Sequence, residues 1–240
     1  MLSRDEKYMR MCFALAKKGF EKVAPNPMVG CVVLDKDGNL ISKGYHKKYG
    51  ENHAERDALL KLKNNEAEGG TLYVNLEPCS HFGKTPPCVD LIIKHKLKRV
   101  VIGMKDVNPK VDGITKLKNA GIEVDFVLEE EARFLNRMFI KTMTEKMPYV
   151  VLKTASTMDG KIASKTGSSK WITSETARKE VYRMRKEFDC IMTSSNTVIA
   201  DNPSMQHNFK CILDKDLRTP KDAKIYQQGE FILPQRKILR

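Results

Sequence analysis

The spacing of apolar positions switches repeatedly between a helical and a strand period over the first 146 residues. A helix is predicted from Ser3 to Gly19, because Ser3 and Glu6 match a capping box and apolar side chains then recur every three or four residues. Two strands at 30–34 and 40–45 follow, joined by the turn residues 37–39. Further helices are expected at 53–62, 88–95, 116–120 and 129–146, and further strands at 71–75, 99–102 and 122–127. Strands that alternate with helices predict a three-layer α/β domain.

A second unit begins where Pro148 ends the last of these helical patterns. Beyond it, strands are predicted at 149–155 and 189–193, with a capped helix at 174–186 between them. The pattern weakens after Asn202-Pro203. The expected organisation is one α/β domain over residues 1–146 and another over 147–240.

Composition restricts the class of protein. Hydrophobic residues make up 41% of 240, enough for a packed core, and no apolar run approaches the roughly 18 residues of a membrane helix. The first residues lack the charged-then-apolar pattern of a signal peptide. Six scattered cysteines do not form a disulfide framework. A cytoplasmic protein with no membrane contact is expected.

The net charge of +13 is dispersed. Residues 1–140 contain 24 basic and 19 acidic residues, and residues 141–240 contain 19 and 11. A dispersed excess favours solubility or a phosphorylated substrate over nucleic-acid binding, which usually needs a basic arm or patch.

One constellation carries chemistry. His53, Cys79 and Cys88 offer an imidazole and two thiolates, a three-ligand set that leaves the fourth tetrahedral position of a zinc ion (Zn2+) open for water. Glu55 follows His53 by two residues and could move protons beside the metal. The pattern H-x-E with a later P-C and a second Cys is typical of zinc-dependent nucleobase deaminases, although their cysteines are usually two residues apart. A His-x-Glu or a widely spaced Cys pair alone would be weak evidence for a metal, and Cys12 and Cys31 are expected in the core.

The geometry of such a site constrains its helices. Two residues turn a regular helix by about 200°, so His53 is expected at the very start of its helix. Cys79 and Cys88 are also expected near helix starts, where free amides favour thiolates.

The residues around this motif resemble the bifunctional deaminase–reductase family of riboflavin biosynthesis. The resemblance rests on the stretches 25–30, 44–46, 53–55 and 77–88, whose wide cysteine spacing is the family's own, and on 153, 158–163, 171–173 and 200–203. It extends from about residue 5 to about residue 205. It implies a cytidine-deaminase-like domain followed by the first part of a dihydrofolate-reductase-like domain. A homo-oligomer is also expected.

The resemblance implies two reactions on a phosphoribosylamino-pyrimidine: hydrolysis of a ring amino group at zinc, and NADPH-dependent reduction of the ribose to a ribityl chain. It makes His53, Cys79 and Cys88 the zinc ligands and Glu55 the proton shuttle. It places near the pyrimidine or its ribose phosphate Asn26, His46, His81, Lys84, Asp106 and Asn108. In the second domain it assigns cofactor contacts to Ala155, Trp171, Thr197 and Asp201, and substrate contacts to Lys153, Ser169 and Arg185. Outside the motif, Asn26 would be read as a turn residue, Lys84 as a solvated charge, Trp171 as a core or interface residue, and the helix ending at Arg185 as a solvated amphipathic helix.

Two departures from the family pattern matter. The family has a second glycine after Gly113, where this chain has Ile114. After Asn202-Pro203 the family has a threonine and a substrate-contacting arginine, where this chain has residues 206–209, Gln-His-Asn-Phe. The family's later strands and glycine-containing cofactor loop are also missing, so we expect a truncated reductase domain with weak or absent reduction beside robust deamination.

Two other functions fit parts of the sequence. A tRNA adenosine or nucleoside deaminase would share the zinc chemistry, but without the wide cysteine spacing or a reductase-like segment. A non-catalytic nucleic-acid-binding protein would use the positive charge, but aromatic residues are only 7% and the charge is dispersed.

Overall fold

The computed structural model describes residues 2–63, 65–83 and 85–234. The chain divides into two compact units, Met1–Val151 and Leu152–Arg240. None of the described helices is both long and apolar enough to cross a membrane.

The first unit is built on a five-stranded sheet of order β2-β1-β3-β4-β5. Its strands are β1 (Gly30–Leu34), β2 (Leu40–Tyr45), β3 (Thr71–Val74), β4 (Arg99–Ile102) and β5 (Glu123–Phe126). β1 is antiparallel to β2 and β3, while β3, β4 and β5 are parallel. All five strands lie where the sequence predicts them, within a residue at each end.

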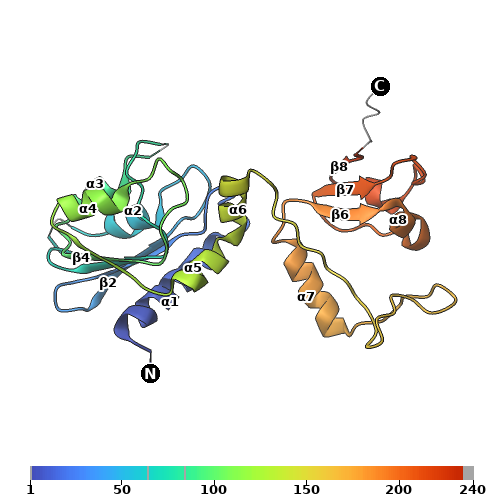
Figure 1. The fold of residues 1–240 in the computed structure, drawn as a ribbon, viewed down its shortest axis with the longest axis horizontal. Helices are drawn as coiled ribbons and strands as arrows, with labels where there is room; N and C mark the ends of the chain where they lie inside the picture. Colours follow the sequence, from blue (N-terminus) through green and yellow to red (C-terminus); the bar gives the residue numbers. More distant parts are fainter. Residues whose placement is uncertain (1, 64, 84, 235–240) are drawn as a thin grey trace. The chain divides into compact units, whose positions relative to one another are not determined.

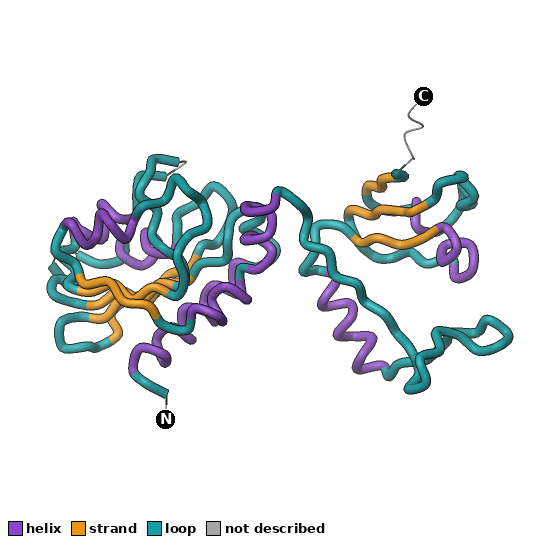
Figure 2. The backbone as a smooth tube through the Cα atoms, viewed as in Figure 1, coloured by secondary structure: helices purple, strands orange, loops and turns teal. Residues whose placement is uncertain are grey.

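Helices cover both faces of this sheet, which confirms the three-layer α/β prediction (Figures 1 and 2). One face packs against α2 (Ala54–Leu59), α3 (Cys88–Lys94) and α4 (Gly113–Asn119). The other packs against α1 (Arg4–Ala16) and α5 (Glu129–Leu135). Neighbouring residues alternate between the two cores, as Val32 and Val33 do on β1, because successive side chains of a strand point to opposite faces.

The capping box at the start of α1 is present. Ser3 Oγ accepts a hydrogen bond from the Glu6 amide at 3.2 Å, and the Glu6 carboxylate accepts one from the Ser3 amide at 2.7 Å. α1 ends at Ala16 and continues as a 3-10 turn, η1 (Lys17–Gly19). The predicted helix 53–62 ends sooner, at Leu59.

The prediction of one long helix over 129–146 is wrong. The structure has two helices, α5 and α6 (Arg137–Glu145), separated at Asn136, where φ is −102° and ψ is 21°. Asn136 is buried, accepts a hydrogen bond from Met28 N at 2.9 Å and donates one to Met28 O at 3.0 Å. These tertiary hydrogen bonds hold the side chain against the loop before β1 and explain why helical periodicity alone misplaced the element.

The second unit contains a three-stranded parallel sheet of order β6-β7-β8. Its elements are α7 (Glu175–Arg185), β6 (Ile191–Ser194), α8 (Ser195–Asp201), β7 (Phe209–Leu213), η2 (Lys224–Tyr226) and β8 (Glu230–Ile232). Its small core contains Val198, Ile212, Ala223 and Ile225. The predicted cap of α7 is present, since Ser174 Oγ accepts from the Ala177 amide at 3.2 Å.

The predicted strand over 149–155 is wrong. Those residues form no ladder, and Val150 and Leu152 are 73% and 87% exposed. A strand requires a hydrogen-bonded neighbour, and the sheet described in this unit consists of β6, β7 and β8. High β-propensity without a pairing partner therefore left the segment irregular.

Candidate active site

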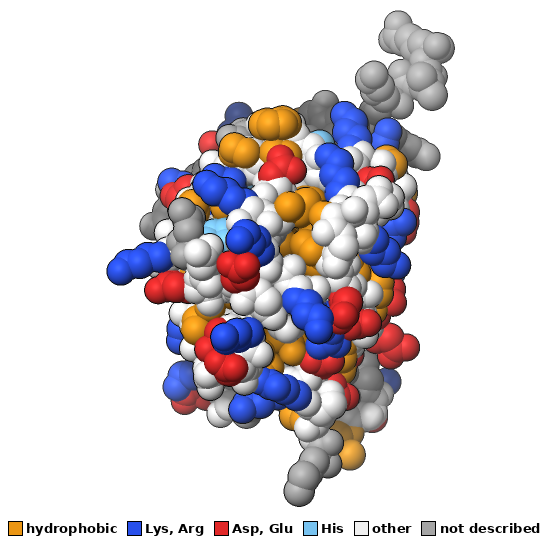
Figure 3. Space-filling view, turned by 90° about the vertical axis from the view of Figure 1, so that its left-hand side faces the viewer, with side chains coloured by type: hydrophobic (Ala, Val, Ile, Leu, Met, Phe, Trp, Pro, Cys, Tyr) orange, Lys and Arg blue, Asp and Glu red, His pale blue; other side chains and the backbone are white. Residues whose placement is uncertain are grey.

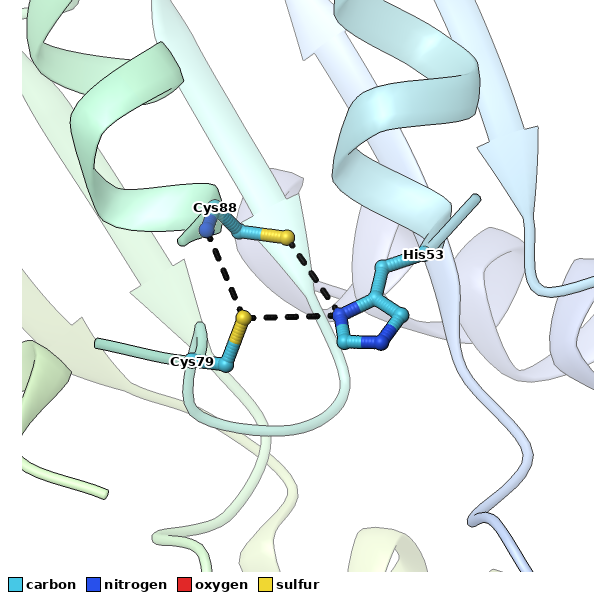
Figure 4. A group of neighbouring side chains, drawn as sticks. All are labelled: His53, Cys79 and Cys88. Atoms are coloured by element: carbon cyan, nitrogen blue, oxygen red, sulfur yellow. Dashed lines mark hydrogen bonds between the residues drawn. The ribbon is translucent and has the colours of Figure 1, made fainter. Parts of the chain in front are cut away.

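Two helix starts and one loop bring His53, Cys79 and Cys88 together (Figure 4). His53 is the N-cap of α2, Cys88 is the first residue of α3, and Cys79 lies in the loop after β3. The His53 Nδ1 atom is 3.4 Å from Cys79 Sγ and 3.5 Å from Cys88 Sγ. His53 thus stands at the helix start, as predicted. Cys79 lies on no helix of its own, but its sulfur is 3.4 Å from the Cys88 amide, at the start of α3.

This arrangement fits a zinc ion. With bond lengths of about 2.3 Å to sulfur and 2.05 Å to nitrogen, tetrahedral geometry separates the N and S ligand atoms by about 3.6 Å. The observed separations of 3.4 and 3.5 Å agree with this value. The three donor atoms lie within 4.8 Å of one another. The donor set is the one that zinc prefers, and it leaves one tetrahedral position for a non-protein ligand.

The electrostatics of the thiols favour metal binding. A hydrogen bond from Cys88, followed by one with His53, holds the pKa of the Cys79 thiol well below its usual range. Hydrogen bonding to Cys79 and burial raise the pKa of the Cys88 thiol. The site therefore favours the thiolate form of Cys79, the form that binds a metal cation.

Glu55 lies in the first turn of α2, and its side chain is 3% exposed. Burial raises the pKa of this carboxyl to about 7. A buried carboxyl with a pKa near neutrality can both accept and release a proton.

Gly44 allows α2 to lie directly on the sheet. A Cβ atom at this position would overlap the carbonyl oxygen of Ala54 and the amide of Ala58. Close packing of α2 on β2 thus sets the position of His53 and Glu55 at the helix start.

A cavity of about 370 Å³ opens beside the three ligands. His53, Glu55 and Cys79 line it, and so do five of the six residues that the resemblance places near the substrate: Asn26, His46, His81, Asp106 and Asn108. Lys84, the sixth, lies outside the described residues. Phe139 and Met143 of α6 add an apolar wall. Polar groups and apolar walls around one concavity are typical of a small-molecule site.

Asp106 contributes a half-buried carboxyl to this cavity. Burial raises the pKa of the Asp106 carboxyl, while a hydrogen bond from the Asn108 amide at 2.8 Å opposes that rise. The two residues therefore form one polar corner of the cavity.

Sequence reasoning missed three positioning residues. Glu77 is buried; its Oε1 accepts from the Gly113 and Ile114 amides at 2.8 and 3.1 Å, and its Oε2 accepts from the Asp106 amide at 3.1 Å. Asn75 accepts from Gly30 N at 2.7 Å and donates to Met28 O at 2.9 Å. With Asn136, these side chains fix the two loops that carry Asn26 and Asp106. Two polar residues at the end of a buried strand were the available signal.

The structure shows the surroundings of Ile114, where the family has a second glycine. α4 begins at Gly113, and both the Gly113 and Ile114 amides are held by Glu77. A Cβ at Gly113 would overlap Pro78 O, so the helix start lies directly against the loop of Cys79.

The residues predicted for the second domain are spread over several elements. Thr197 and Asp201 lie on α8, and Arg185 ends α7, donating to Met205 O at 3.3 Å. Trp171 is 70% exposed with the Arg178 guanidinium 4.2 Å from its ring centroid. Lys153, Ala155 and Ser169 lie in irregular segments before α7. In the part of the chain that the structure describes, no hydrogen bond links Lys153, Ser169 and Arg185 to one another.

Two family models match the chain, one in each unit. The cytidine and deoxycytidylate deaminase zinc-binding region matches residues 2–104, and the RibD C-terminal domain matches residues 148–237. A crystal structure from Thermotoga maritima, titled a diaminohydroxyphosphoribosylaminopyrimidine deaminase/5-amino-6-(5-phosphoribosylamino)uracil reductase, is 42% identical with a TM-score of 0.88 and covers 96% of this chain, which spans 69% of it. The chain belongs to the RibD family.

Other RibD proteins are similar to this chain over most of its length. Acinetobacter baumannii RibD is 41% identical with a TM-score of 0.85, over 97% of this chain and 70% of that one. The riboflavin biosynthesis protein RibD of Aquifex aeolicus is 47% identical over 237 residues, and that of Escherichia coli 45% over 238. These alignments cover 94% and 98% of this chain, but 66% and 61% of those proteins.

The RibD family match corrects one expectation. The resemblance continues past residue 205, to residue 237. β7 and β8, which the weak hydrophobic pattern did not reveal, lie in this stretch.

Proposed function

We propose that the first unit, which contains the predicted domain 1–146, is a zinc-dependent deaminase of riboflavin biosynthesis. Its substrate would be a diamino-phosphoribosylamino-pyrimidinone, which loses one ring amino group as ammonia. The observation that carries the proposal is the convergence of His53, Cys79 and Cys88 at zinc-ligand separations, with buried Glu55 in the same cavity.

A zinc ion held by His53, Cys79 and Cys88 would supply a Lewis acid that makes water nucleophilic near neutral pH. The Glu55 carboxyl, whose pKa burial raises to about 7, can both accept and release a proton near neutral pH. Its carboxylate accepts one proton of the attacking water and then delivers it to the leaving amine, so that the C–N bond breaks with release of neutral ammonia. Burial of Glu55 keeps bulk water from competing for that proton.

The remaining lining residues would hold the substrate. Asn26, His81, Asp106 and Asn108 provide hydrogen-bonding groups to a polar ring and sugar, and His46 lies beside Asn26. By the family pattern, Lys84 would provide a cation for the phosphate.

Charge distribution supports a small-molecule substrate over a polynucleotide. On the face drawn in Figure 3, basic and acidic side chains are interspersed and form no continuous basic patch. Nucleic-acid binding usually requires a basic patch or stripe.

Ammonia release from a panel of substrates tests this proposal. The purified chain, with zinc, is given the diaminopyrimidine with its ribosyl phosphate, the same compound without phosphate, cytidine, and tRNA. The proposal expects the highest kcat/KM for the phosphorylated pyrimidine. Faster release from cytidine or tRNA would favour the nucleoside or tRNA deaminase instead.

We further propose that the predicted domain 147–240, which contains the second unit, is related to an NADPH-dependent reductase, because residues 148–237 match the RibD C-terminal domain. Ala155, Trp171, Thr197 and Asp201 would contact NADPH, and Lys153, Ser169 and Arg185 the ribose phosphate. Since residues 206–209 replace the family's threonine and arginine, reduction should be much slower than deamination. NADPH oxidation followed at 340 nm with the deaminated product tests this; a rate equal to that of ammonia release would refute it.

We also propose that the enzyme acts in the cytoplasm as a homo-oligomer. None of the six cysteines forms a disulfide, as expected in a reducing compartment. Exposed apolar side chains on the second unit's sheet, at Met192, Leu213 and Phe231, support self-association. Light scattering coupled to size-exclusion chromatography tests the assembly, and a monomer at all concentrations would contradict it.

A further inference from the structure

His46 occupies a position in the cavity that defines where its proton lies. Its side chain is 3% exposed and lines the cavity beside His53. The Nδ1 atom is 3.0 Å from Asn52 O, and the Nε2 atom is 3.1 Å from Asn26 Nδ2. A backbone carbonyl oxygen only accepts hydrogen bonds, so Nδ1 must carry a hydrogen.

The other ring nitrogen of His46 accepts a hydrogen bond. The ring is buried and packs edge-on against the ring of His53, with centroids 5.6 Å apart. The Nε2 atom faces the Asn26 amide nitrogen, which only donates hydrogen bonds, so Nε2 is the acceptor of that pair. In neutral His46 with its hydrogen on Nδ1, the Nε2 atom is a bare acceptor.

This proton position determines how the neighbouring amide is turned. A bare Nε2 can be paired only by a donor, so Asn26 must present its NH₂ group to His46. The Asn26 backbone is also restrained, since it lies between Pro25 and Pro27 and its amide donates to Val23 O at 2.8 Å. No hydrogen bond among the described residues uses Asn26 Oδ1, and Asn26 lines the cavity.

We propose that His46 is a positioning residue that locks the Asn26 amide, so that Asn26 Oδ1 accepts a hydrogen bond from an N–H or O–H donor of the substrate. This inference rests on the proposed deaminase function. It adds which partner donates and which accepts the hydrogen bond in one substrate contact. A substrate with a donor at that point is favoured, and one with an acceptor there is rejected because two acceptors would face each other.

The position of the proton can be measured without substrate. Long-range ¹H–¹⁵N correlation NMR of the zinc-loaded full chain distinguishes the two tautomers of each histidine, and His46→Gln identifies the His46 signals by their loss. The inference expects a protonated Nδ1 and an unprotonated Nε2. A hydrogen on Nε2, alone or together with one on Nδ1, would overturn it.

Steady-state kinetics test whether Asn26 Oδ1 accepts a hydrogen bond from the substrate. Removal of one buried hydrogen bond by Asn26→Leu should lower kcat/KM by about 10- to 100-fold, which corresponds to about 1.4–2.7 kcal/mol. His46→Phe, which keeps a ring but no nitrogen, should lower it in the same direction because the Asn26 amide becomes free to turn. His95→Gln is the matched control: this histidine is also buried but does not line the cavity, so kcat/KM should stay within about twofold.

Repeating the Asn26→Leu comparison on the pyrimidine without its sugar locates the donor. A penalty that persists places the donor on the ring, and one that vanishes places it on the ribosyl group; both agree with the inference. Unchanged kcat/KM on both substrates would overturn it. If the wild type released no ammonia from either, the proposed function and the substrate contact would both fall, while NMR would still decide the tautomer.

Discussion

The break between α5 and α6 provides a quantitative test of how tertiary hydrogen bonds shape the site. Asn136 holds Met28 through two hydrogen bonds, one to its amide and one to its carbonyl. In Asn136→Ala the Met28 carbonyl keeps its bond from Asn75 at 2.9 Å, but the Met28 amide loses its acceptor. The perturbation therefore leaves one unsatisfied N–H group.

The magnitude follows from two opposing effects. A buried donor without an acceptor costs about 1–3 kcal/mol. Alanine is a better helix former than asparagine by about 0.5 kcal/mol and would let α5 and α6 join. The variant should therefore lose about 1–2.5 kcal/mol of the free energy of unfolding of the first unit.

Hydrogen–deuterium exchange of the full chain, followed in peptides that cover β1 and β3, measures that free energy locally. The loss corresponds to exchange about 5- to 70-fold faster in the central strands. Asn119→Ala, an exposed position at the end of α4, is the control and should change the free energy by less than about 0.5 kcal/mol. Exchange in Asn136→Ala as slow as in the wild type would show that the Met28 hydrogen bonds do not hold this loop.

Three further predictions test other parts of the structure. Cys88→Ser should reduce bound zinc, measured by atomic emission, from about one ion per chain to well below one, while Cys190→Ser should leave it unchanged; equal zinc in both would contradict the ligand set. Glu77→Gln should lower the free energy of unfolding by about 2–4 kcal/mol in the same exchange assay, because an NH₂ group then faces at least one of three backbone donors. The control Glu68→Gln changes an exposed pair with Lys96 and should lower it by less than about 1 kcal/mol. Equal losses in the two variants would refute the role of Glu77. Hydrogen bonds from Arg99 and Tyr73 lower the pKa of Asp5, so the stability lost in Asp5→Asn should be constant above about pH 5 and shrink as pH falls below about 4; a difference that grows in acid would have the wrong sign.

Local sequence signals were sufficient for the elements that depend on local physics. Ser3 and Ser174 cap their helices as the sequence predicts, and the five strands of the first unit follow from their apolar runs. The convergence of His53, Cys79 and Cys88 as candidate zinc ligands could be predicted because zinc accepts few donor types and the family's wide spacing is specific.

Features that depend on distant partners could not be predicted. The kink at Asn136 is set by Met28, which is 108 residues away. In the sequence, Glu77 is recognisable only as part of a motif. The fold shows that its carboxylate accepts a hydrogen bond from the Gly113 amide at the start of α4. The segment 149–155 has strand-forming residues, but pairing depends on a neighbouring strand that local sequence does not specify.

The central claim is that Glu55 moves the proton for deamination at a zinc ion held by His53, Cys79 and Cys88. Ammonia release from the phosphorylated diaminopyrimidine, measured for the wild type and for Glu55→Gln with zinc content determined on the same samples, tests it most directly. The account predicts about one zinc per chain in both proteins, and a loss of turnover of at least about 100-fold in the variant. Turnover by zinc-loaded Glu55→Gln at the wild-type rate would contradict it.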